Sequence, residues 1–256
     1  MRRQKTARAR ARPIFALACI AALLSGCSGS GWGWYVVSPA TEQGRTNLAF
    51  LIGGMWDTIL ISLVSMALSI AVGLLVALPG LSERKLWRRV NIVYVEFVRA
   101  IPILVLILWV YYGLPVIAGI ELDVFWAGVL ALALSDSAVE AEIFRAGIPS
   151  LTNGQTEAAK SMGLSYMQTM RLVILPQAIR RILPPLGNQF AYMLKISALV
   201  SVIGMQELTR RANELVVTEY RPLEIYTVLI LEYLVLILIV SQGVRWLERH
   251  MSRNER

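Results

Sequence analysis

The sequence predicts an all-α integral membrane protein, with five core transmembrane helices, a helical cytoplasmic loop and an N-terminal signal or anchor segment. Hydrophobic residues make up 56% of the 256 residues and charged residues only 16%, whereas about a quarter of a soluble domain is charged. Residues 58–82 and 100–120 contain no charged side chain. Each run is long enough to cross a bilayer core, which takes about 20 apolar residues in a helix.

The N-terminus joins a basic segment to a short apolar run. Six of the charges behind the net charge of +8 lie at Arg2, Arg3, Lys5, Arg8, Arg10 and Arg12. This clustering indicates a topology signal rather than a surface for nucleic acid, so no nucleic-acid partner is expected. Residues 14–24 are apolar, which is short for a span and typical of a signal-peptide core.

Residues 24–27 read Leu-Ser-Gly-Cys, which resembles the lipobox of bacterial lipoproteins. Two alternatives follow: cleavage before Cys27 with lipid attached to it, or an uncleaved anchor in which Cys27 is a small apolar residue. Residues 1–27 are therefore interpreted as the signal or anchor segment, and residues 28–47 as a periplasmic linker. The cysteines and the single His250 show no metal-ligand spacing, so no metal site is expected.

Five apolar segments follow and form a transmembrane domain at residues 48–248. They cover about residues 48–81, 91–115, 124–148, 185–205 and 223–247. Lys and Arg gather after the first segment, between the third and fourth, and in the tail at 249–256, whereas the connection between the second and third holds Glu121 and Asp123 and no base. Because Lys and Arg concentrate on the cytoplasmic side, these basic connections and the C-terminus are predicted to lie inside.

The long connection at about residues 150–184 predicts two short helices. Ala and Glu favour the first, which shows Ala158, Ala159 and Met162 on neighbouring positions, and Gly163 is well placed to end it. Small and flexible apolar groups on one face suit docking into a groove of a partner. The alternative is an amphipathic hairpin at the membrane interface.

A capping box of Ser165 and Gln168 predicts the start of the second helix. This helix is expected to stop before Pro176, because proline lacks a backbone donor. Pro184-Pro185 is then expected to re-aim the chain into the fourth span.

Glu157-Ala158-Ala159 and Gly163-Leu164 form the centre of a longer ordered pattern. Further parts of it are residues 96–102, 112–115, 141–148, 173–180, 183–188, 201–203 and 207–208. The pattern resembles the EAA loop and its flanks in permease subunits of ABC importers, in particular the polar amino acid uptake family. The resemblance covers roughly residues 48–248.

In that family the loop inserts a coupling helix into a cleft on the ATP-binding subunit. The resemblance implies this role for Glu157, Ala158, Ala159, Met162, Gly163 and Leu164. It also implies three partners: an ATPase subunit that holds ATP and Mg, a second permease subunit, and a periplasmic solute-binding protein that meets the loop at 206–221. The chain lacks a Gly-x-x-x-x-Gly-Lys-Ser/Thr phosphate loop, so it is expected to need no cofactor and to be no enzyme itself.

The chain departs from the family pattern within its spans. Residues 98–102 read Val-Arg-Ala-Ile-Pro where Phe-Arg-Gly-Thr-Pro is usual, and residues 195–198 read Lys-Ile-Ser-Ala where Lys-Asp/Asn-Thr/Ser-Ser is usual. Val139 stands where an aromatic residue is common, and Glu140 beside it is unusual. These departures leave the identity of the substrate open.

Several ionisable or polar groups lie at membrane depth, where they are costly and usually face a cavity or a partner. The candidates for a solute pathway are Asp136, Glu140, Asn188 and Lys195. The acids Asp136 and Glu140 share a helix face and favour a cationic or zwitterionic solute, while Lys195 argues against a purely acidic lining. The alternative is structural pairing between helices.

Other charges at the same depth are expected to pair locally. Glu96 with Arg99, and Glu142 with Arg145, have the i,i+3 spacing of helix ion pairs. Glu232 is expected to pair with Lys195 or with a second subunit.

The predicted function is that of the membrane-spanning permease of an ATP-driven importer for a polar amino acid or a similar small polar solute, in a bacterial inner membrane. One rival is a self-sufficient carrier or channel, but five spans are few and no inverted repeat is evident. A second rival is a membrane sensor that uses the same loop. Such a sensor needs no polar groups within its spans, and this chain has them.

Overall fold

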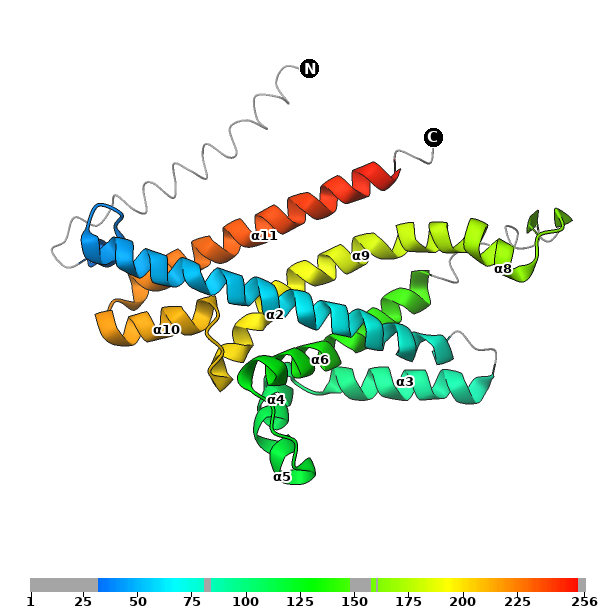
Figure 1. Ribbon diagram of the computed structural model, residues 1–256, viewed down its shortest axis with the longest axis horizontal. Coiled ribbons are helices and arrows are strands. Elements are labelled where there is room, and N and C mark those ends of the chain that lie inside the picture. The colour runs from blue at the N-terminus through cyan, green and yellow to red at the C-terminus, as the bar shows by residue number, and fades with distance from the viewer. Residues whose placement is uncertain (1–31, 81–83, 148–157, 160, 253–256) are drawn as a thin grey trace, which may run out of the picture. The chain divides into compact units, whose positions relative to one another are not determined.

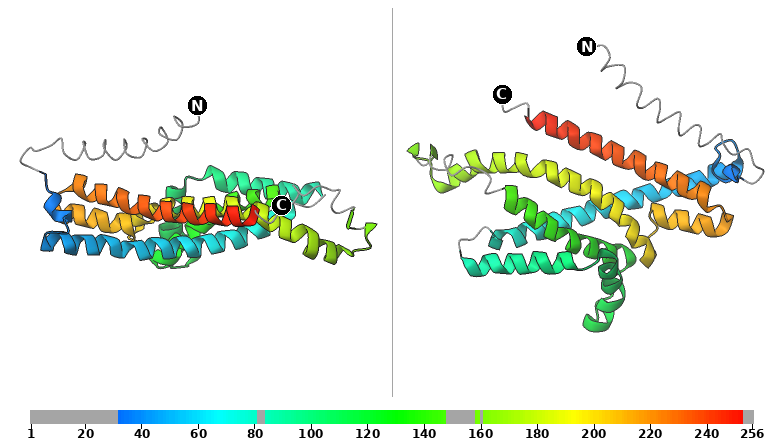
Figure 2. Two further views of the ribbon diagram at one scale, coloured as in Figure 1. Left: turned by 90° about the horizontal axis from the view of Figure 1, so that it is seen from above. Right: turned by 180° about the vertical axis from the view of Figure 1, so that it is seen from behind.

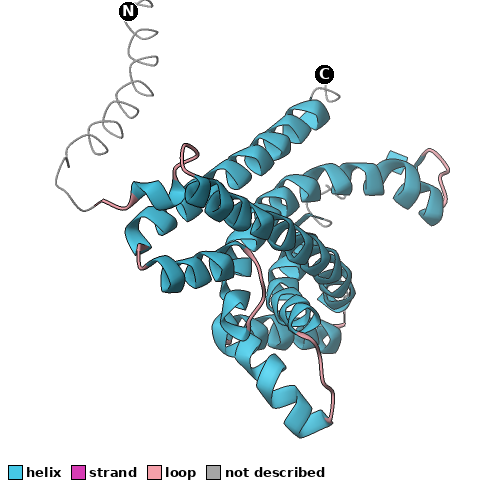
Figure 3. Ribbon diagram, turned by 60° about the vertical axis from the view of Figure 1, so that its left-hand side comes forward, coloured by secondary structure: helices cyan, strands magenta, loops and turns pink. Residues whose placement is uncertain are grey.

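The computed structural model describes residues 32–80, 84–147, 158–159 and 161–252. Every regular element in those residues is a helix, as Figure 3 shows by colour. The prediction of an all-α fold is therefore confirmed. Cys27 and Glu157 lie outside the described residues, so nothing in the structure bears on their predicted roles.

The chain divides into a unit at Met1–Trp34 and a unit at Tyr35–Arg256. In the first, the rings of Trp32 and Trp34 stack with centroids 6.1 Å apart. A 3-10 turn, η1, covers Trp34–Val37. The elements that follow are α2 (Glu42–Gly80), α3 (Lys85–Ala100), α4 (Ile103–Leu108), η2 (Trp109–Gly113), α5 (Leu114–Ala118), α6 (Val124–Gly147), α8 (Tyr166–Thr169), η3 (Met170–Ile174), α9 (Leu175–Ile196), η4 (Ser197–Ile203), α10 (Leu208–Glu219) and α11 (Pro222–Ser252), as labelled in Figure 1.

Four helices of the described part are long and apolar enough to cross a membrane, and a bent pair gives a fifth span if it counts as one. The four are α2, α6, the continuous helix Met167–Ile203 and the part of α11 at Pro222–Leu247. Helix α2 begins at Glu42, earlier than the expected residue 48, and has 39 residues. At 1.5 Å per residue it is about 58 Å long and extends well beyond a bilayer core of about 30 Å.

The second span is not the straight helix that the sequence predicts at residues 91–115. Helix α3 starts earlier, at Lys85, and the chain then bends by 92° between Lys85–Ala100 and Ile103–Ala118. The bend lies at Ile101 and Pro102, which both have extended backbone angles. Proline has no donor for the helix and forces the residue before it out of the helical region, so the apolar run breaks there.

The fourth span also differs from the prediction. Neither Pro176 nor Pro184-Pro185 ends a helix, because α9 runs through all three prolines. Pro176 lies in the first turn of α9, where a donor is not needed. The preceding turn η3 is π-helical, a wider turn that accommodates an interrupted hydrogen-bond ladder. One continuous helix therefore leads from the loop predicted to be cytoplasmic into the predicted fourth span.

Small residues on α2 let α6 pack closely against it. Ser62, Ser65, Ser69, Gly73 and Ala77 are all buried along one face of α2. A Cβ atom added at Gly73 would lie only 2.5 Å from the Glu140 Cβ and 3.0 Å from the Ser137 carbonyl oxygen. Small residues at regular spacing allow two membrane helices to bring their backbones together, and this contact has that form.

Two apolar cores lie along the α2–α6 pair, one on each side of a polar layer. The first gathers around Ile61 and Ile107, and the second around Ala77 and Phe144. The polar layer consists of the buried Ser69 of α2, which falls between the two cores along the helix, and Asp136 of α6, to which Ser69 is hydrogen-bonded. Within the second unit, α10 lies at one end of the bundle and α8 at the other, as Figures 1 and 2 show. The polar layer therefore lies between the end of the bundle that carries α10 and the end that carries α8.

Replacing Gly73 by Ala is expected to lower the free energy of unfolding by about 1–3 kcal/mol, because neither a neighbouring Cβ nor a backbone oxygen can move aside cheaply. Chemical unfolding of the purified protein in detergent measures the effect. Gly243→Ala is the matched control, since no atom lies within 4 Å of a Cβ placed there. Equal stability of the two variants would contradict the close α2–α6 contact.

Candidate functional site

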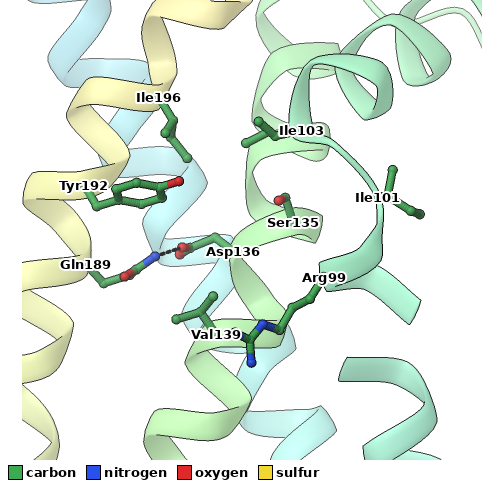
Figure 4. Close-up of a pocket in the computed structure, with 9 residues that line it drawn as sticks. All are labelled: Arg99, Ile101, Ile103, Ser135, Asp136, Val139, Gln189, Tyr192 and Ile196. Atoms are coloured by element: carbon green, nitrogen blue, oxygen red, sulfur yellow. Dashed lines mark hydrogen bonds between the residues drawn. The ribbon is translucent and has the colours of Figure 1, made fainter. Parts of the chain in front are cut away.

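A cavity of about 240 Å³ lies in the polar layer, between α9, α6 and the bend that joins α3 to α4 (Figure 4). Its volume suits a small polar solute rather than a drug-sized ligand. Polar and apolar side chains share the lining, which consists of Arg99, Ile101, Ile103, Ser135, Asp136, Val139, Gln189, Tyr192 and Ile196.

Asp136 is the acid of this cavity and is 3% exposed. The Ser69 hydroxyl donates to its Oδ2 over 2.7 Å, and the Gln189 side-chain amide donates to its Oδ1. The second contact is the dashed line in Figure 4. These bonds join α2, α6 and α9 at one carboxylate. Both donors are neutral, so no positive side chain among the described residues is bonded to Asp136.

Arg99 is the basic residue of the cavity lining. Its ion-pair partner differs from the predicted one. Its Nη1 lies 2.7 Å from Oε2 of Glu142, so the ion pair joins α3 to α6. The expected i,i+3 pairs of Arg99 with Glu96, and of Glu142 with Arg145, are absent from the described residues. A contact between two packed helices has replaced two pairs within single helices. The Arg99 and Glu142 side chains remain 54% and 38% exposed, which leaves Arg99 accessible to a ligand.

Of the four predicted pathway residues, only Asp136 lines the cavity. Glu140 is fully buried against α2, and neither of its oxygens has a hydrogen-bond partner among the described residues. Asn188 and Lys195 lie exposed on α9, away from the lining. Glu232 of α11 is buried, and its oxygens also lack a described partner, so the expected pairing with Lys195 is absent there.

Sequence reasoning missed several lining residues. Gln189, Tyr192 and Ile196 face the cavity from α9, and Ser135 faces it from α6. The signal was available for the α9 residues, because their spacing of three and then four is that of one helix face. Ser69 donates a hydrogen bond to Asp136, but nothing in the sequence distinguishes it from the other small residues of its apolar span.

The described part of the loop between α6 and α9 has a well-defined turn. The Leu164 N–H donates to the Ala159 carbonyl over 3.1 Å, and Gly163 has φ +79°. This six-to-one bond around a left-handed glycine is a common helix C-cap, so the prediction that Gly163 ends the helix is confirmed. Met162 is 81% exposed beside the turn, whereas Ala159 is buried.

The predicted capping box is also confirmed. The Ser165 N–H donates to the Gln168 side chain over 2.9 Å, and the Gln168 N–H donates to the Ser165 hydroxyl over 3.3 Å. The box begins the helix that continues through η3 into α9 and on to Gln189. A single helix therefore connects the exposed turn at Gly163 with the cavity lining at Gln189.

At the opposite end of the bundle, polar contacts attach α10 to α2. Glu219 accepts hydrogen bonds from the Gln43 and Asn47 side chains. Arg211 donates to the Phe50 carbonyl over 3.0 Å and lies 3.4 Å from Asp57. We call α10 and residues 43–57 of α2, which carry these contacts, the end cap.

A buried acid begins α10. The Glu207 side chain accepts hydrogen bonds from the Arg210 N–H, over 2.7 Å, and from the Tyr233 hydroxyl of α11, over 2.9 Å. Burial raises the pKa of Glu207 above its ordinary value of 4.5, although these donors oppose the shift. This carboxyl ties α10 to α11.

The geometry agrees with comparisons to known proteins. A family described as "Binding-protein-dependent transport system inner membrane component" matches residues 69–253. The chain belongs to this family. As such a permease, it is the membrane-spanning subunit of an ABC importer and not itself an enzyme, because ATP hydrolysis belongs to a separate subunit.

Two bacterial relatives resemble this permease over most of its length. The probable glutamine ABC transporter permease protein GlnM of Bacillus subtilis (strain 168) is 38% identical over 208 residues, which are 81% of this chain and 96% of that protein. The glutamine transport system permease protein GlnP of Escherichia coli (strain K12) is 36% identical over 220 residues, which are 86% of this chain and 97% of that protein.

Solved structures give the same result. A chain in the crystal structure of an amino acid ABC transporter with histidines matches this permease with a TM-score of 0.74 and 40% identity, covering 80% of this chain and 96% of that one. A chain of the inward-facing MetNI methionine ABC transporter matches with a TM-score of 0.67 and 23% identity, covering 80% and 97%, and shows the shared fold alone. Family membership implies a separate ATPase and a solute-binding partner for this permease.

The raised pKa of Glu207 predicts how pH affects stability. An acid that binds its proton more tightly in the folded state stabilises the fold most below its ordinary pKa of 4.5, and this contribution is lost as pH rises through the raised value. Glu207→Gln should therefore flatten the fall in melting temperature that follows as pH rises above the ordinary pKa of 4.5, measured in detergent.

Glu214→Gln is the matched control on the same helix. The Gln206 and Arg210 side chains lower the pKa of Glu214, so its contribution has the opposite sign and is lost as pH falls. A pH profile that Glu207→Gln leaves unchanged would contradict the role assigned to the buried carboxyl.

Proposed function

We propose that this permease transports an amino acid through the cavity between α3, α6 and α9. The observation that carries the proposal is the presence of Arg99 and Asp136 in the lining of one small cavity. A guanidinium suits the α-carboxylate of an amino acid, and a carboxylate suits its α-ammonium group. The named activities of the glutamine permeases support an amino acid as the solute class.

The exposed turn of the cytoplasmic loop is proposed to dock into the ATPase subunit. The residues proposed for this role are Glu157, which lies outside the described residues, and Ala158, Ala159, Met162, Gly163 and Leu164. Two observations support this role: Met162 is 81% exposed although it is apolar, and the turn continues as a single helix to the cavity. Lys85, Arg88 and Arg89 are exposed at the start of α3 and support a cytoplasmic location for this end and for the C-terminus.

A second permease subunit is proposed to cover the exposed side of α9. Asn188 and Lys195 lie exposed seven residues apart, and so on one face of a helix that crosses the membrane. Polar groups at this depth usually face a cavity or a partner rather than lipid. An identical or similar subunit on that face would place both residues beside the solute path.

Other finer assignments follow from the same orientation. The end cap then faces the periplasm of a bacterium and receives the solute-binding protein. Residues 1–27 are assigned to a signal or anchor, with Cys27 as the candidate lipid site. The external linker is assigned to residues 28–47 and the permease domain to residues 48–248. The cytoplasmic tail is assigned to residues 249–256. ATP and Mg belong to the partner ATPase.

Met162→Asp is expected to reduce the amount of ATPase that co-purifies from mild-detergent membranes by at least about tenfold, because a charge buried in an apolar docking cleft costs several kcal/mol. Met162→Leu is the control and should retain the ATPase. The yield and melting temperature of the permease itself should not change, since the side chain is exposed. Equal ATPase in all three preparations would contradict docking through this turn.

Tyr220 offers a test of the outer docking surface. It is 82% exposed beyond the end of α10 and has a positive φ of 54°. Tyr220→Gly keeps that backbone conformation at no steric cost while it removes the ring. If the ring is an anchor for the solute-binding protein, the variant should need about tenfold or more binding protein for half-maximal ATPase stimulation. Basal ATPase activity without binding protein should stay the same, and unchanged stimulation would exclude Tyr220 as an anchor.

A further inference from the structure

An ion pair at the edge of the cavity joins a lining residue to an acid outside the lining. Arg99 lines the cavity and its Nη1 lies 2.7 Å from Oε2 of Glu142, which does not line it. Glu142 follows the lining residue Val139 by three positions on α6, so it lies on the same helix face about one turn further along. Figure 4 shows the Arg99 side chain directed from the end of α3 toward Val139. The guanidinium is therefore placed between the cavity and Glu142.

This ion pair has the properties of a contact that a ligand can replace. One hydrogen bond joins the two side chains, which are 54% and 38% exposed. Exposed ion pairs contribute little to stability, whereas two parallel N–H bonds hold a carboxylate on a guanidinium more firmly. The guanidinium has five N–H donors, so a carboxylate in the cavity can be bound by two of them at once.

The packing of α3 against α6 does not depend on this ion pair. The Tyr94 hydroxyl of α3 lies 2.8 Å from the Ser137 hydroxyl of α6, within hydrogen-bond distance. Val98 of α3 and Ala141 of α6 are both buried in the second apolar core. The two helices would therefore stay together if Arg99 released Glu142, and only the two side chains would have to move.

We propose that Glu142 competes with the α-carboxylate of the solute for Arg99, and so keeps solute binding weak enough for release. The inference rests on the proposed function, since it takes Arg99 as the group that binds the carboxylate of an amino acid. In the absence of solute, Arg99 donates to Glu142. The carboxylate of the solute replaces Glu142 on binding, and Glu142 recovers Arg99 when the solute leaves. Glu142 is thus a positioning residue that sets affinity without touching the solute.

The test compares L-glutamine and L-arginine with their α-amides, which lack the carboxylate but keep the ammonium group and the side chain. Binding to the purified permease–ATPase complex is measured without a solute-binding protein. Glu142→Gln should tighten the binding of both amino acids by about two- to fivefold, which is the factor that an exposed ion pair accounts for. Their dissociation should slow by a similar factor. The affinities of the α-amides should not change, because these compounds have no carboxylate for Arg99.

Two further variants separate this contact from a general effect of charge. Glu96→Gln removes an exposed acid that lies three positions before Arg99 on α3 and outside the cavity lining, and it should change no affinity. Glu142→Asp keeps the negative charge but shortens the side chain, so it should tighten amino acid binding by a smaller factor than Glu142→Gln. It also provides the measurement if Glu142→Gln folds poorly.

An unchanged or weaker affinity of Glu142→Gln for amino acids that the unaltered complex binds would overturn the competition and leave amino acid transport standing. Equal tightening for the α-amides would also overturn it, because the effect would then come from the shape or the overall charge of the cavity. Failure of every amino acid both to bind and to enter vesicles that contain the complete importer would instead remove the proposed function.

Discussion

The close contact of α2 with α6 is the constraint on which the rest of the structure depends. No Cβ atom fits at Gly73 without displacing Glu140 or the backbone at Ser137. Because the two helices approach this closely, the Ser69 hydroxyl reaches Asp136 across the interface. The same contact encloses Glu140 and holds α6 in place beside α3, where Glu142 meets Arg99. Larger side chains on α2 would separate these groups.

The position of the cavity also follows from the elements around it. The break at Pro102 turns the chain by 92° and provides one wall, and the long helix through η3 and α9 provides another. That helix starts next to the exposed turn at Met162 and passes Gln189, which is bonded to Asp136. A movement at the turn can therefore reach the polar layer through a single rigid element, which is what coupling to a separate ATPase requires.

Much of the fold could be predicted from the sequence, because bilayer thickness and loop charge constrain membrane helices strongly. The turn at Gly163 and the capping box at Ser165 were also predictable, since both depend on local chemistry. Two predictions about prolines failed, because the same local chemistry can either break a helix or be accommodated at the start of one. Pro102 breaks a helix, whereas Pro176 is accommodated within one. The difference lies in the π-helical turn η3 before Pro176, which no residue pattern predicted.

The site itself was predictable only in part. Asp136 was identified because an acid at membrane depth stands out in any sequence. Gln189 and Ser69 were missed because their importance comes from where α9 and α2 pass Asp136, which depends on packing. Arg99 was assigned to a neighbour on its own helix, whereas in the fold it meets Glu142 of α6. Contacts between helices were the information that the linear spacing lacked.

The measurement that tests the central claim most directly is solute protection of a cysteine in the cavity. Ser135→Cys is introduced with Cys19 and Cys27 replaced by Ser, and its reaction with a small thiol reagent is followed in the permease–ATPase complex. Saturating L-glutamine should slow this reaction several-fold and leave Val116→Cys, on the exposed surface of α5, unaffected. Equal reaction rates at Ser135→Cys with and without glutamine, in a complex that still transports it, would contradict a solute path through this cavity.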